Sequence, residues 1–404
     1  MTTSDSTESQ QAVLHRYARS LITVFGAPQL VLERGDGAWV WDTDGKRYLD
    51  LVGGIAVNAL GHNHPALVAA VSKQVGEMAH ISNFYTSRVQ VELAERILEI
   101  AQAPEGSGVF FANSGAEAIE AAIKLSRRTC RTGIVAAEGA FHGRTTGALA
   151  LTHKAAYRDP FTPLIPDVSH VPYNDPEALR AAVTSDTAAV VLEPIQGEAG
   201  AIVADPAYLQ AAREITTAAG ALLIIDEVQT GVGRTGDWFG FQSSGIVPDA
   251  ITLAKGLGGG LPIGALVTFG PAVTGLLTAG QHGSTFGGNP LVAAAGLSVL
   301  ATIEADSLLD HVTEMGEHLV GAVEALGHPD IEGVRGRGLL RAIVLRSDLS
   351  AAVAAAGREA GFLINPVAPN AIRLVPPLVV TSDELDLFVA ALPALIATAK
   401  ESTP

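Results

Sequence analysis

The chain has 404 residues, of which 48% are hydrophobic and 17% are charged, a composition typical of a globular protein with a large core. Its 26 basic and 42 acidic residues give a net charge of −16, which argues against nucleic acid or an anionic membrane as a partner. The single cysteine, Cys130, excludes an internal disulfide and has no second cysteine for a metal motif. We therefore expect a cytoplasmic protein that binds neither nucleic acid nor membrane and holds no metal.

The amino-terminal stretch 1–11 is polar and lacks the basic and apolar regions of a signal peptide, so we predict a disordered tail. No run of 18 apolar residues occurs, and no membrane span is predicted. A hairpin is expected next, with strands at Ala38–Trp41 and Tyr48–Asp50 on either side of a turn at Asp44 and Gly45. A helix should begin just after Pro65.

From about residue 90 to residue 270, apolar strand segments alternate with helical segments such as Pro206–Ala219. This alternation predicts an α/β fold whose mainly parallel sheet is covered by helices on both faces. The predicted strands are Val109–Ala112, Ile134–Ala137, Ala188–Leu192, Ala221–Ile225 and Ala250–Leu253.

An alanine-rich helix, Leu291–Ile303, is predicted to lead out of this core. The remainder mixes helices with short strands at Gly338–Leu345 and Ile372–Val375. We therefore assign residues 66–303 to a large domain, and residues 12–65 and 304–404 to a smaller α+β domain built from both chain ends.

Two predicted strands end on residues of opposite charge. The apolar run before Asp226 and Glu227 is typical of a buried parallel strand, and Lys255 follows a second such stretch before a glycine run. Both strand ends face the same crevice in an open α/β sheet. A fixed amine and a fixed carboxylate suit pyridoxal phosphate, which bonds to a lysine and needs its pyridine nitrogen kept protonated. The alternative is a buried structural Asp–Lys pair.

A phosphate cradle is predicted where the strand Val109–Ala112 leads through small residues into a helix. The backbone N–H groups of Gly115 and Ala116 are expected to bind the phosphate, because a helix start presents free donors. Ser114 either contacts the phosphate or caps the helix, since Ser114-x-x-Glu117 is also a capping box.

Several segments resemble the class-III (ω) aminotransferase family, and the resemblance covers nearly the whole chain. They are FFANSGAEAIEAAIKLSR, FHGRT, LEPIQGE, DEVQTG, GRTG, PDAITLAKGLGGG, HGSTFGGNP and IRLVPPL. Glycines of DEVQTGVGRTG also spell G-x-G-x-x-G, but no helix text follows, so a dinucleotide site is rejected. The resemblance implies a PLP enzyme of fold type I that forms a homodimer with shared active sites.

The resemblance also implies a role for each matching residue. Lys255 and Asp226 would be catalytic, and Phe141 would stack on the cofactor ring. Thr285 would contact the phosphate in the neighbouring subunit, and Ser284 would contact the substrate. The remaining cofactor contacts would come from Glu227, Val228 and Gln229.

Within the family the motifs are most similar to those of enzymes that act on N-acetylornithine. This implies transfer of its terminal amino group to 2-oxoglutarate, which gives glutamate. Arg144 would grip the distal carboxylate of the donor, and Arg373 the α-carboxylate of glutamate or 2-oxoglutarate. Glu198 would neutralise Arg373 and swing away when the acceptor arrives.

Alternative donors are succinylornithine, N-succinyldiaminopimelate, ornithine and 4-aminobutyrate. An aminomutase would keep the amino group on one substrate and need no acceptor. A non-enzymatic descendant is expected to have lost Lys255 or Asp226, and both are present.

Overall fold

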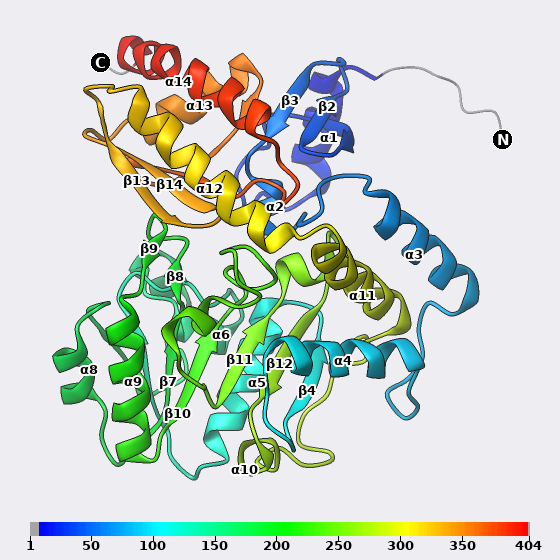
Figure 1. Ribbon diagram of the computed structural model, residues 1–404, viewed down its shortest axis with the longest axis vertical. Helices are drawn as coiled ribbons and strands as arrows, with labels where there is room; N and C mark the ends of the chain where they lie inside the picture. The colour runs from blue at the N-terminus through cyan, green and yellow to red at the C-terminus, as the bar shows by residue number, and fades with distance from the viewer. Residues whose placement is uncertain (1–7, 403–404) are drawn as a thin grey trace.

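The computed structural model describes residues 8–402. Its centre is a seven-stranded sheet, which lies in the lower part of Figure 1. The strand order is β4-β12-β11-β10-β7-β5-β6. Only β12 runs antiparallel, and it does so to both of its neighbours. The strands are β4 (Gly108–Ala112), β5 (Gly133–Ala137), β6 (Val168–Val171), β7 (Thr187–Leu192), β10 (Leu222–Asp226), β11 (Ala250–Leu253) and β12 (Gly264–Thr268).

Helices cover both faces of this sheet. Leu223 and Ile225 of β10 pack with one helical layer, and their neighbours Leu222 and Ile224 pack with the other, as the alternation of side chains along a strand requires. The first layer includes α4 (Arg88–Ile100) and α9 (Pro206–Ala219), and the second includes α5 (Gly115–Arg127) and α6 (Thr146–Leu151). The predicted α/β class and the doubly covered sheet are confirmed.

Helix α9 shows how local sequence sets an element. Asp205 accepts a hydrogen bond from Ala207 N, Pro206 occupies the first turn, and Gly220 ends the helix with φ 66°. A side-chain cap, an initial proline and a left-handed glycine are the standard start and stop signals of a helix. The predicted bounds of this helix are confirmed.

The chain ends form two smaller sheets above the large one, and helices α12, α13 and α14 pack beside them (Figure 1). In the first sheet β15 pairs parallel with β3 through Phe362 and Leu49, so both chain ends contribute to it. Its order is β1-β2-β3-β15, with bounds Leu32–Asp36, Trp39–Asp42, Arg47–Asp50 and Phe362–Leu363. The second has the order β13-β14-β17-β16, with bounds Ile331–Arg337, Leu340–Leu345, Ala371–Leu374 and Asn365–Ala368.

Shorter elements and the remaining helices connect these sheets. They are α1 (Gln10–Ser20), α2 (Gly53–Ala56), α3 (Pro65–Glu77), α7 (Ala155–Arg158), η1 (Asp159–Phe161), α8 (Pro176–Ala182), β8 (Ile195–Gln196), β9 (Ile202–Val203), η2 (Gly240–Ser244), η3 (Lys255–Gly258), α10 (Pro271–Thr274), α11 (Pro290–Ala305), α12 (Leu308–Ala325), α13 (Ser350–Ala360) and α14 (Ser382–Ser402).

One prediction at the amino terminus is wrong in part. Helix α1 begins at Gln10, inside the expected tail, because the Ser9 hydroxyl caps it by accepting from Ala12 N. Residues 1–7 of that tail lie outside the described residues. Strands β1, β6, β8, β9, β12, β13, β15 and β16 were not predicted. Among them, β13 (IEGVRGR) carries no buried residue, so it lacks an apolar pattern.

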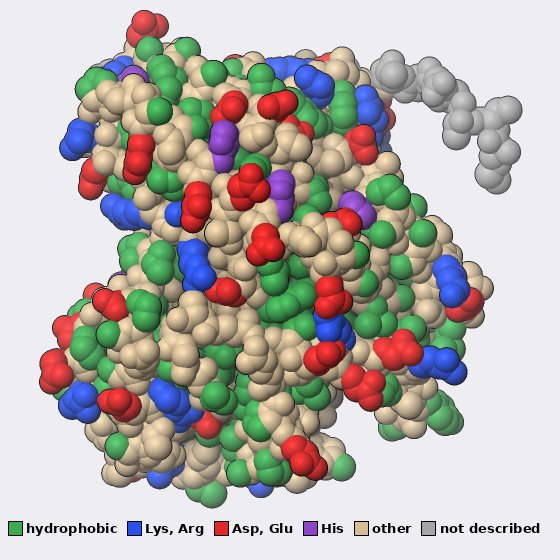
Figure 2. Space-filling model, viewed as in Figure 1, with side chains coloured by type: hydrophobic (Ala, Val, Ile, Leu, Met, Phe, Trp, Pro, Cys, Tyr) green, Lys and Arg blue, Asp and Glu red, His purple; other side chains and the backbone are tan. Residues whose placement is uncertain are grey.

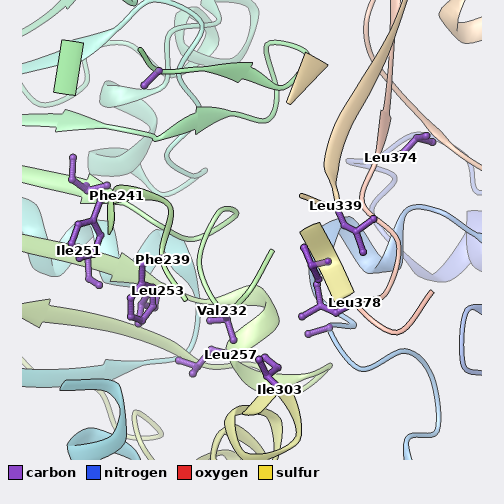
Figure 3. Packing of buried hydrophobic residues seen from close by; sticks show 14 of the residues in the cluster. Val232, Phe239, Phe241, Ile251, Leu253, Leu257, Ile303, Leu339, Leu374 and Leu378 are labelled. Atoms are coloured by element: carbon purple, nitrogen blue, oxygen red, sulfur yellow. The ribbon is translucent and has the colours of Figure 1, made fainter. Parts of the chain in front are cut away.

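The apolar core is continuous between the large sheet and the upper part of the molecule. Figure 3 shows Ile251 and Leu253 of β11 on one side of this core, and Leu374 and Leu378 on the other. Val232 and Leu257 lie between them in the same view. The strands that carry the charged residues are therefore held by a shared core.

The outer surface is mixed in character. Acidic side chains are spread over both parts of the face shown in Figure 2. Between residues 8 and 402 no single helix is long and apolar enough to cross a bilayer; only α11 and α12 taken together, across a bend of 69°, meet that length and composition.

Candidate active site

A cavity of about 430 Å³ lies beyond the ends of β10 and β11. Its lining brings together residues from six stretches of the chain, between Val57 and Ile263. Those predicted as site residues are Ser114, Gly115, Ala116, Phe141, Arg144, Asp226, Val228, Gln229 and Lys255. This is the crevice that an open α/β sheet offers at the carboxyl ends of its strands.

Asp226 is 4% exposed, and both of its carboxylate oxygens are engaged. Oδ1 accepts from Val228 N at 3.0 Å and from Thr252 Oγ1 at 3.0 Å, while Oδ2 lies 2.7 Å from His142 Nδ1. These three contacts fix the orientation of the buried carboxylate at the cavity wall. A cationic group bound in the cavity could pair with it.

His142 lines the cavity and was not predicted as a site residue. Its ring is buried, its backbone N–H donates to Thr152 Oγ1 at 3.0 Å, and its Nε2 has no hydrogen-bond partner among the described residues. Burial lowers the pKa of His142, but the hydrogen bond and charge of Asp226 outweigh it and raise that pKa. The signal available in the sequence was its place between Phe141 and Arg144 in FHGRT.

Lys255 follows β11 after one residue, Ala254, and adopts φ 44°, a left-handed backbone that is uncommon outside glycine. No hydrogen bond or ion pair holds its amine within the described part of the chain. Burial first, and then the charge of Arg373, lower the pKa of Lys255 to about 8 against the opposing effects of Glu198, Asp226 and Glu193. A neutral lysine amine near physiological pH is a nucleophile.

Glu193 also lines the cavity and was not predicted. Burial raises the pKa of Glu193 to about 8, while His142 lowers it less. Its carboxyl group accepts from Phe141 N at 3.2 Å, and its backbone carbonyl accepts from Tyr173 at 2.6 Å. Glu193 therefore fixes the segment that carries Phe141 and His142.

Ser114, at the start of α5, was predicted either to cap this helix or to contact the phosphate. Its hydroxyl accepts from Glu117 N at 3.2 Å, so it caps the helix, and it also lines the cavity. Glu117 completes no capping box, because its carboxylate accepts from the backbone and side chain of Asn113 at 2.9 and 2.7 Å.

The backbone N–H groups of Gly115 and Ala116 have no acceptor among the described residues, so they remain available to an anion. A Cβ atom at Gly115 would lie 2.8 Å from Val228 Cγ1. The close approach of helix and strand end at this point therefore requires glycine.

Two aromatic rings and an arginine form one wall of the site. Phe141 and Tyr157 meet edge to face with centroids 6.4 Å apart, and the Arg144 guanidinium lies 3.6 Å from the Tyr157 ring centroid. Arg144 is exposed, and within residues 8–402 it makes no ion pair. Its charge is open to an incoming carboxylate.

A second arginine, Arg373 of β17, is only 1% exposed and is neutralised. Its Nη1 donates to Glu198 Oε1 at 2.6 Å and to Gln229 Oε1 at 3.1 Å, and its Nη2 donates to Asn365 Oδ1 at 2.6 Å. The predicted pairing of Glu198 with Arg373 is present. Gln229 links this pair to the cavity, which it lines.

Five predicted site residues do not line the cavity: Glu198, Glu227, Ser284, Thr285 and Arg373. Glu227 is turned away, because its carboxylate accepts from Thr230 Oγ1 at 2.5 Å, Gly240 N at 2.9 Å and Phe241 N at 2.7 Å. This placement does not agree with the predicted contact between the Glu227 side chain and the cofactor. Successive strand residues point to opposite sides of the sheet, and Asp226 already faces the cavity.

The loop carrying Ser284 and Thr285 is only partly connected to the site. Asn113 Nδ2 donates to Ser284 Oγ at 2.8 Å, which ties the loop to the start of α5. Thr285 is exposed and does not line the cavity. Between residues 8 and 402 no group of three or more His, Cys, Asp or Glu side chains is placed to hold a metal ion.

The donor set fits pyridoxal phosphate. A free amine, a fixed carboxylate, an aromatic ring and two unpaired N–H groups at a helix start surround one cavity. These match the covalent attachment, the ring nitrogen, the flat ring and the phosphate of that cofactor.

Residues 24–396 match the family described as aminotransferase class-III. The chain belongs to the class-III aminotransferase family. Members of this family use pyridoxal phosphate, which agrees with the donor set of the cavity.

Relatives of known name extend over almost the entire chain. The chain is 54% identical to acetylornithine aminotransferase of Streptomyces coelicolor over 98% of both chains. It is 54% identical to the Mycobacterium tuberculosis protein of the same name over 94% of this chain and 95% of that one.

Solved structures agree with this membership. N-acetylornithine aminotransferase of Stenotrophomonas maltophilia superposes with a TM-score of 0.83 at 34% identity, covering 96% of this chain and 100% of that one. An ornithine aminotransferase of Toxoplasma gondii, with pyridoxal phosphate at partial occupancy in its active site, superposes with a TM-score of 0.91 at 29% identity. The match covers 98% of this chain and 96% of that one. Fold type I, as predicted, is confirmed.

Proposed function

We propose that this protein is an acetylornithine aminotransferase, which moves the terminal amino group of N-acetylornithine to 2-oxoglutarate and so serves arginine biosynthesis. The observation that carries the proposal is the pair of arginines with different partners. Arg144 is open, whereas Arg373 is neutralised by Glu198. One site can therefore accept a donor whose carboxylate is remote from the amine and an acceptor whose carboxylate is adjacent to the reacting carbon.

The cofactor of the proposed reaction is pyridoxal phosphate, which when bound withdraws electrons from the carbon that carries the amine. Asp226, oriented by His142 and Thr252, would keep a positive charge on the ring nitrogen. Phe141 and Val228 would contact the two ring faces, Gln229 the ring hydroxyl, and the α5 start the phosphate.

Lys255 has two tasks in this proposal. Its amine would bond to the cofactor, and once the donor amine displaces it, Nζ would take the proton from the δ-carbon of the donor and deliver it to the cofactor. The lowered pKa of about 8 supports both, because the amine is then neutral in part of the population near neutral pH.

The substrates would be sorted by charge. Arg144 would hold the carboxylate of N-acetylornithine, while Glu198 keeps Arg373 neutral and unattractive to it. When 2-oxoglutarate arrives, Glu198, whose side chain is 33% exposed, would move away, and Arg373 would take the α-carboxylate. Ser284, whose hydroxyl accepts from Asn113 Nδ2 beside the cavity, would contact the substrate.

A homodimer with shared sites is part of the proposal. Phe84, Tyr85 and Phe286 are 92%, 75% and 59% exposed, which is costly for large apolar rings on an isolated chain. Asn83 Nδ2 donates to the carbonyl groups of Ser284 and Gly287, so the two exposed segments form one surface. In a dimer this surface would be covered, and Thr285 would contact the phosphate of the partner subunit.

The test is the visible absorption spectrum of the protein saturated with pyridoxal phosphate. Adding N-acetylornithine alone should convert the cofactor band to that of the aminated cofactor, and 2-oxoglutarate should then restore it. Titration with succinylornithine, ornithine and 4-aminobutyrate ranks the other donors. A cofactor band that ignores N-acetylornithine but responds to one of these would reassign the donor, and turnover without 2-oxoglutarate would indicate an aminomutase.

A further inference from the structure

The neutralisation of Arg373 depends on a single charged group. Of its three hydrogen-bond acceptors, only Glu198 carries a charge; Gln229 and Asn365 accept through amide oxygens. Arginine has donors only, so each amide must turn its oxygen toward the guanidinium. Arg373 Nε is buried without an acceptor, so the guanidinium has no spare partner to lose.

The two groups at 2.6 Å from Arg373 differ in freedom to move. Glu198 follows the two-residue strand β8, and its side chain is 33% exposed. Asn365 begins β16 and is the cross-strand partner of Arg373 itself. Directly paired residues project from the same face of a sheet, so backbone pairing holds Asn365 beside Arg373.

We propose that Asn365 is a specificity-determining positioning residue that keeps Arg373 oriented but un-neutralised while Glu198 is away. This rests on the proposed function, in which Arg373 receives the α-carboxylate of 2-oxoglutarate. An amide oxygen satisfies Nη2 without cancelling the guanidinium charge. The charge of the acceptor subsite is then set by Glu198 alone.

Other residue types at position 365 would fail in different ways. A carboxylate would neutralise Arg373 permanently, because the strand pairing leaves it no route away. An apolar side chain would leave Nη2 as a second unpaired donor on a buried guanidinium. Only a neutral acceptor permits a subsite that switches between neutral and positive.

The decisive variant is Asn365→Asp, which is nearly isosteric. The two half-reactions are followed separately by the cofactor absorbance. We expect the rate with N-acetylornithine to stay within about twofold, and kcat/KM for 2-oxoglutarate to fall about tenfold or more, the scale of one charge-assisted hydrogen bond. Affinity for glutarate, an unreactive five-carbon dicarboxylate, should fall by a similar factor in calorimetry of the cofactor-saturated protein.

A second pair of variants tests whether position 365 is fixed. Glu198→Gln alone should strengthen glutarate binding, because no carboxylate then neutralises the charge of Arg373. The Glu198→Gln, Asn365→Asp double variant should remain weak, since Asp at this position cannot leave. Asn370→Asp is the matched control: it adds the same charge to the β16–β17 turn, where Asn370 Nδ2 donates to Leu345 O.

Each outcome decides the proposal. Equal slowing of both half-reactions in Asn365→Asp, or loss of glutarate binding in Asn370→Asp as well, would mean a general structural effect and overturn it. Recovery in the double variant would show a mobile carboxylate and also overturn it. Should Asn365→Asp fold poorly, Asn365→Ser, which keeps a neutral acceptor, should retain glutarate binding far better than Asn365→Leu. Failure of the proposed function is seen separately, as a wild-type protein that ignores both substrates.

Discussion

The pKa values of single residues at this site depend strongly on their neighbours. Lys255 has a pKa near 8 because burial and the charge of Arg373 disfavour its cation. The pKa of His142 is raised, because the hydrogen bond and charge of Asp226 outweigh the effect of burying the imidazole. The pKa values of two basic groups around one cavity are thereby shifted in opposite directions.

The lowered pKa of Lys255 predicts a pH dependence for cofactor capture by the cofactor-free protein. Only the neutral amine reacts, so the rate of appearance of the cofactor band should rise with pH around a midpoint of about 8, not near the 10.5 of a solvated lysine. Glu198→Gln removes a charge that raises this pKa, so its midpoint should lie lower.

The control for that experiment is Glu401→Gln, an exposed position on the last helix, which should leave the midpoint unchanged. A wild-type midpoint near 10 would contradict the assignment of a buried, partly neutral lysine. A Glu198→Gln midpoint above that of the wild type would contradict the role given to the neighbouring charges.

At the scale of elements, close approaches of backbone decide where glycine is needed. Helix α12 contains two glycines in different surroundings. A Cβ at Gly316 would lie 2.2 Å from the carbonyl oxygen of Gly338, at the β13–β14 turn, whereas nothing lies within 4 Å of a Cβ at Gly321. The helix therefore rests on this turn at Gly316 and faces solvent at Gly321.

These surroundings predict opposite effects of the same substitution. Gly321→Ala should raise the free energy of unfolding by about 0.4–1 kcal/mol, because alanine restricts the unfolded chain and favours the helix. Gly316→Ala should lower it, since backbone cannot give way as a side chain can. Thermal unfolding of the cofactor-free proteins gives the comparison; a higher Tm for Gly316→Ala than for Gly321→Ala would refute this packing.

At the scale of the whole molecule, the exposed surface around Thr285 matters most. Thr285 itself does not line the cavity of its own chain, although the neighbouring Ser284 is tied to Asn113 beside that cavity. Large apolar side chains flank it at Phe84, Tyr85 and Phe286. A symmetric dimer would cover this surface and carry Thr285 to the second site.

Complementation between two inactive variants tests that arrangement. Lys255→Ala lacks the amine, and Thr285→Asp would repel the cofactor phosphate. When the two are co-expressed, random pairing gives heterodimers in half of the dimers, each with one intact site, so activity should return to roughly a quarter of wild type. Each variant alone should be inactive.

No recovery in the mixture, with dimers present by sedimentation, would place Thr285 in its own subunit's site or outside any site. Recovery in a mixture of Lys255→Ala with Asp226→Ala would also argue against the interpretation, because both of these residues lie in one chain's cavity. That mixture is the matched control.

Much of the candidate site could be predicted from local sequence. The apolar runs before Asp226 and Lys255 identified two neighbouring parallel strands, and small residues before α5 identified a helix start. The bounds of β11 and α9 were predicted to the residue. These features depend on interactions within one or two helical turns or along one strand. The residues that make such interactions lie close together in the sequence.

What the sequence determined by itself is the fold class and the family, and it predicted Lys255 and Asp226 as the catalytic pair. The tertiary structure decided which groups surround them: that Glu227 turns away, that His142 orients Asp226, and that Asn365 joins Glu198 on Arg373. Arg373 and Glu198 are 175 positions apart, and His142 and Asp226 are 84 apart. No local pattern encodes such pairs, because they form only when sheet pairing and core packing bring separate strand ends to one cavity.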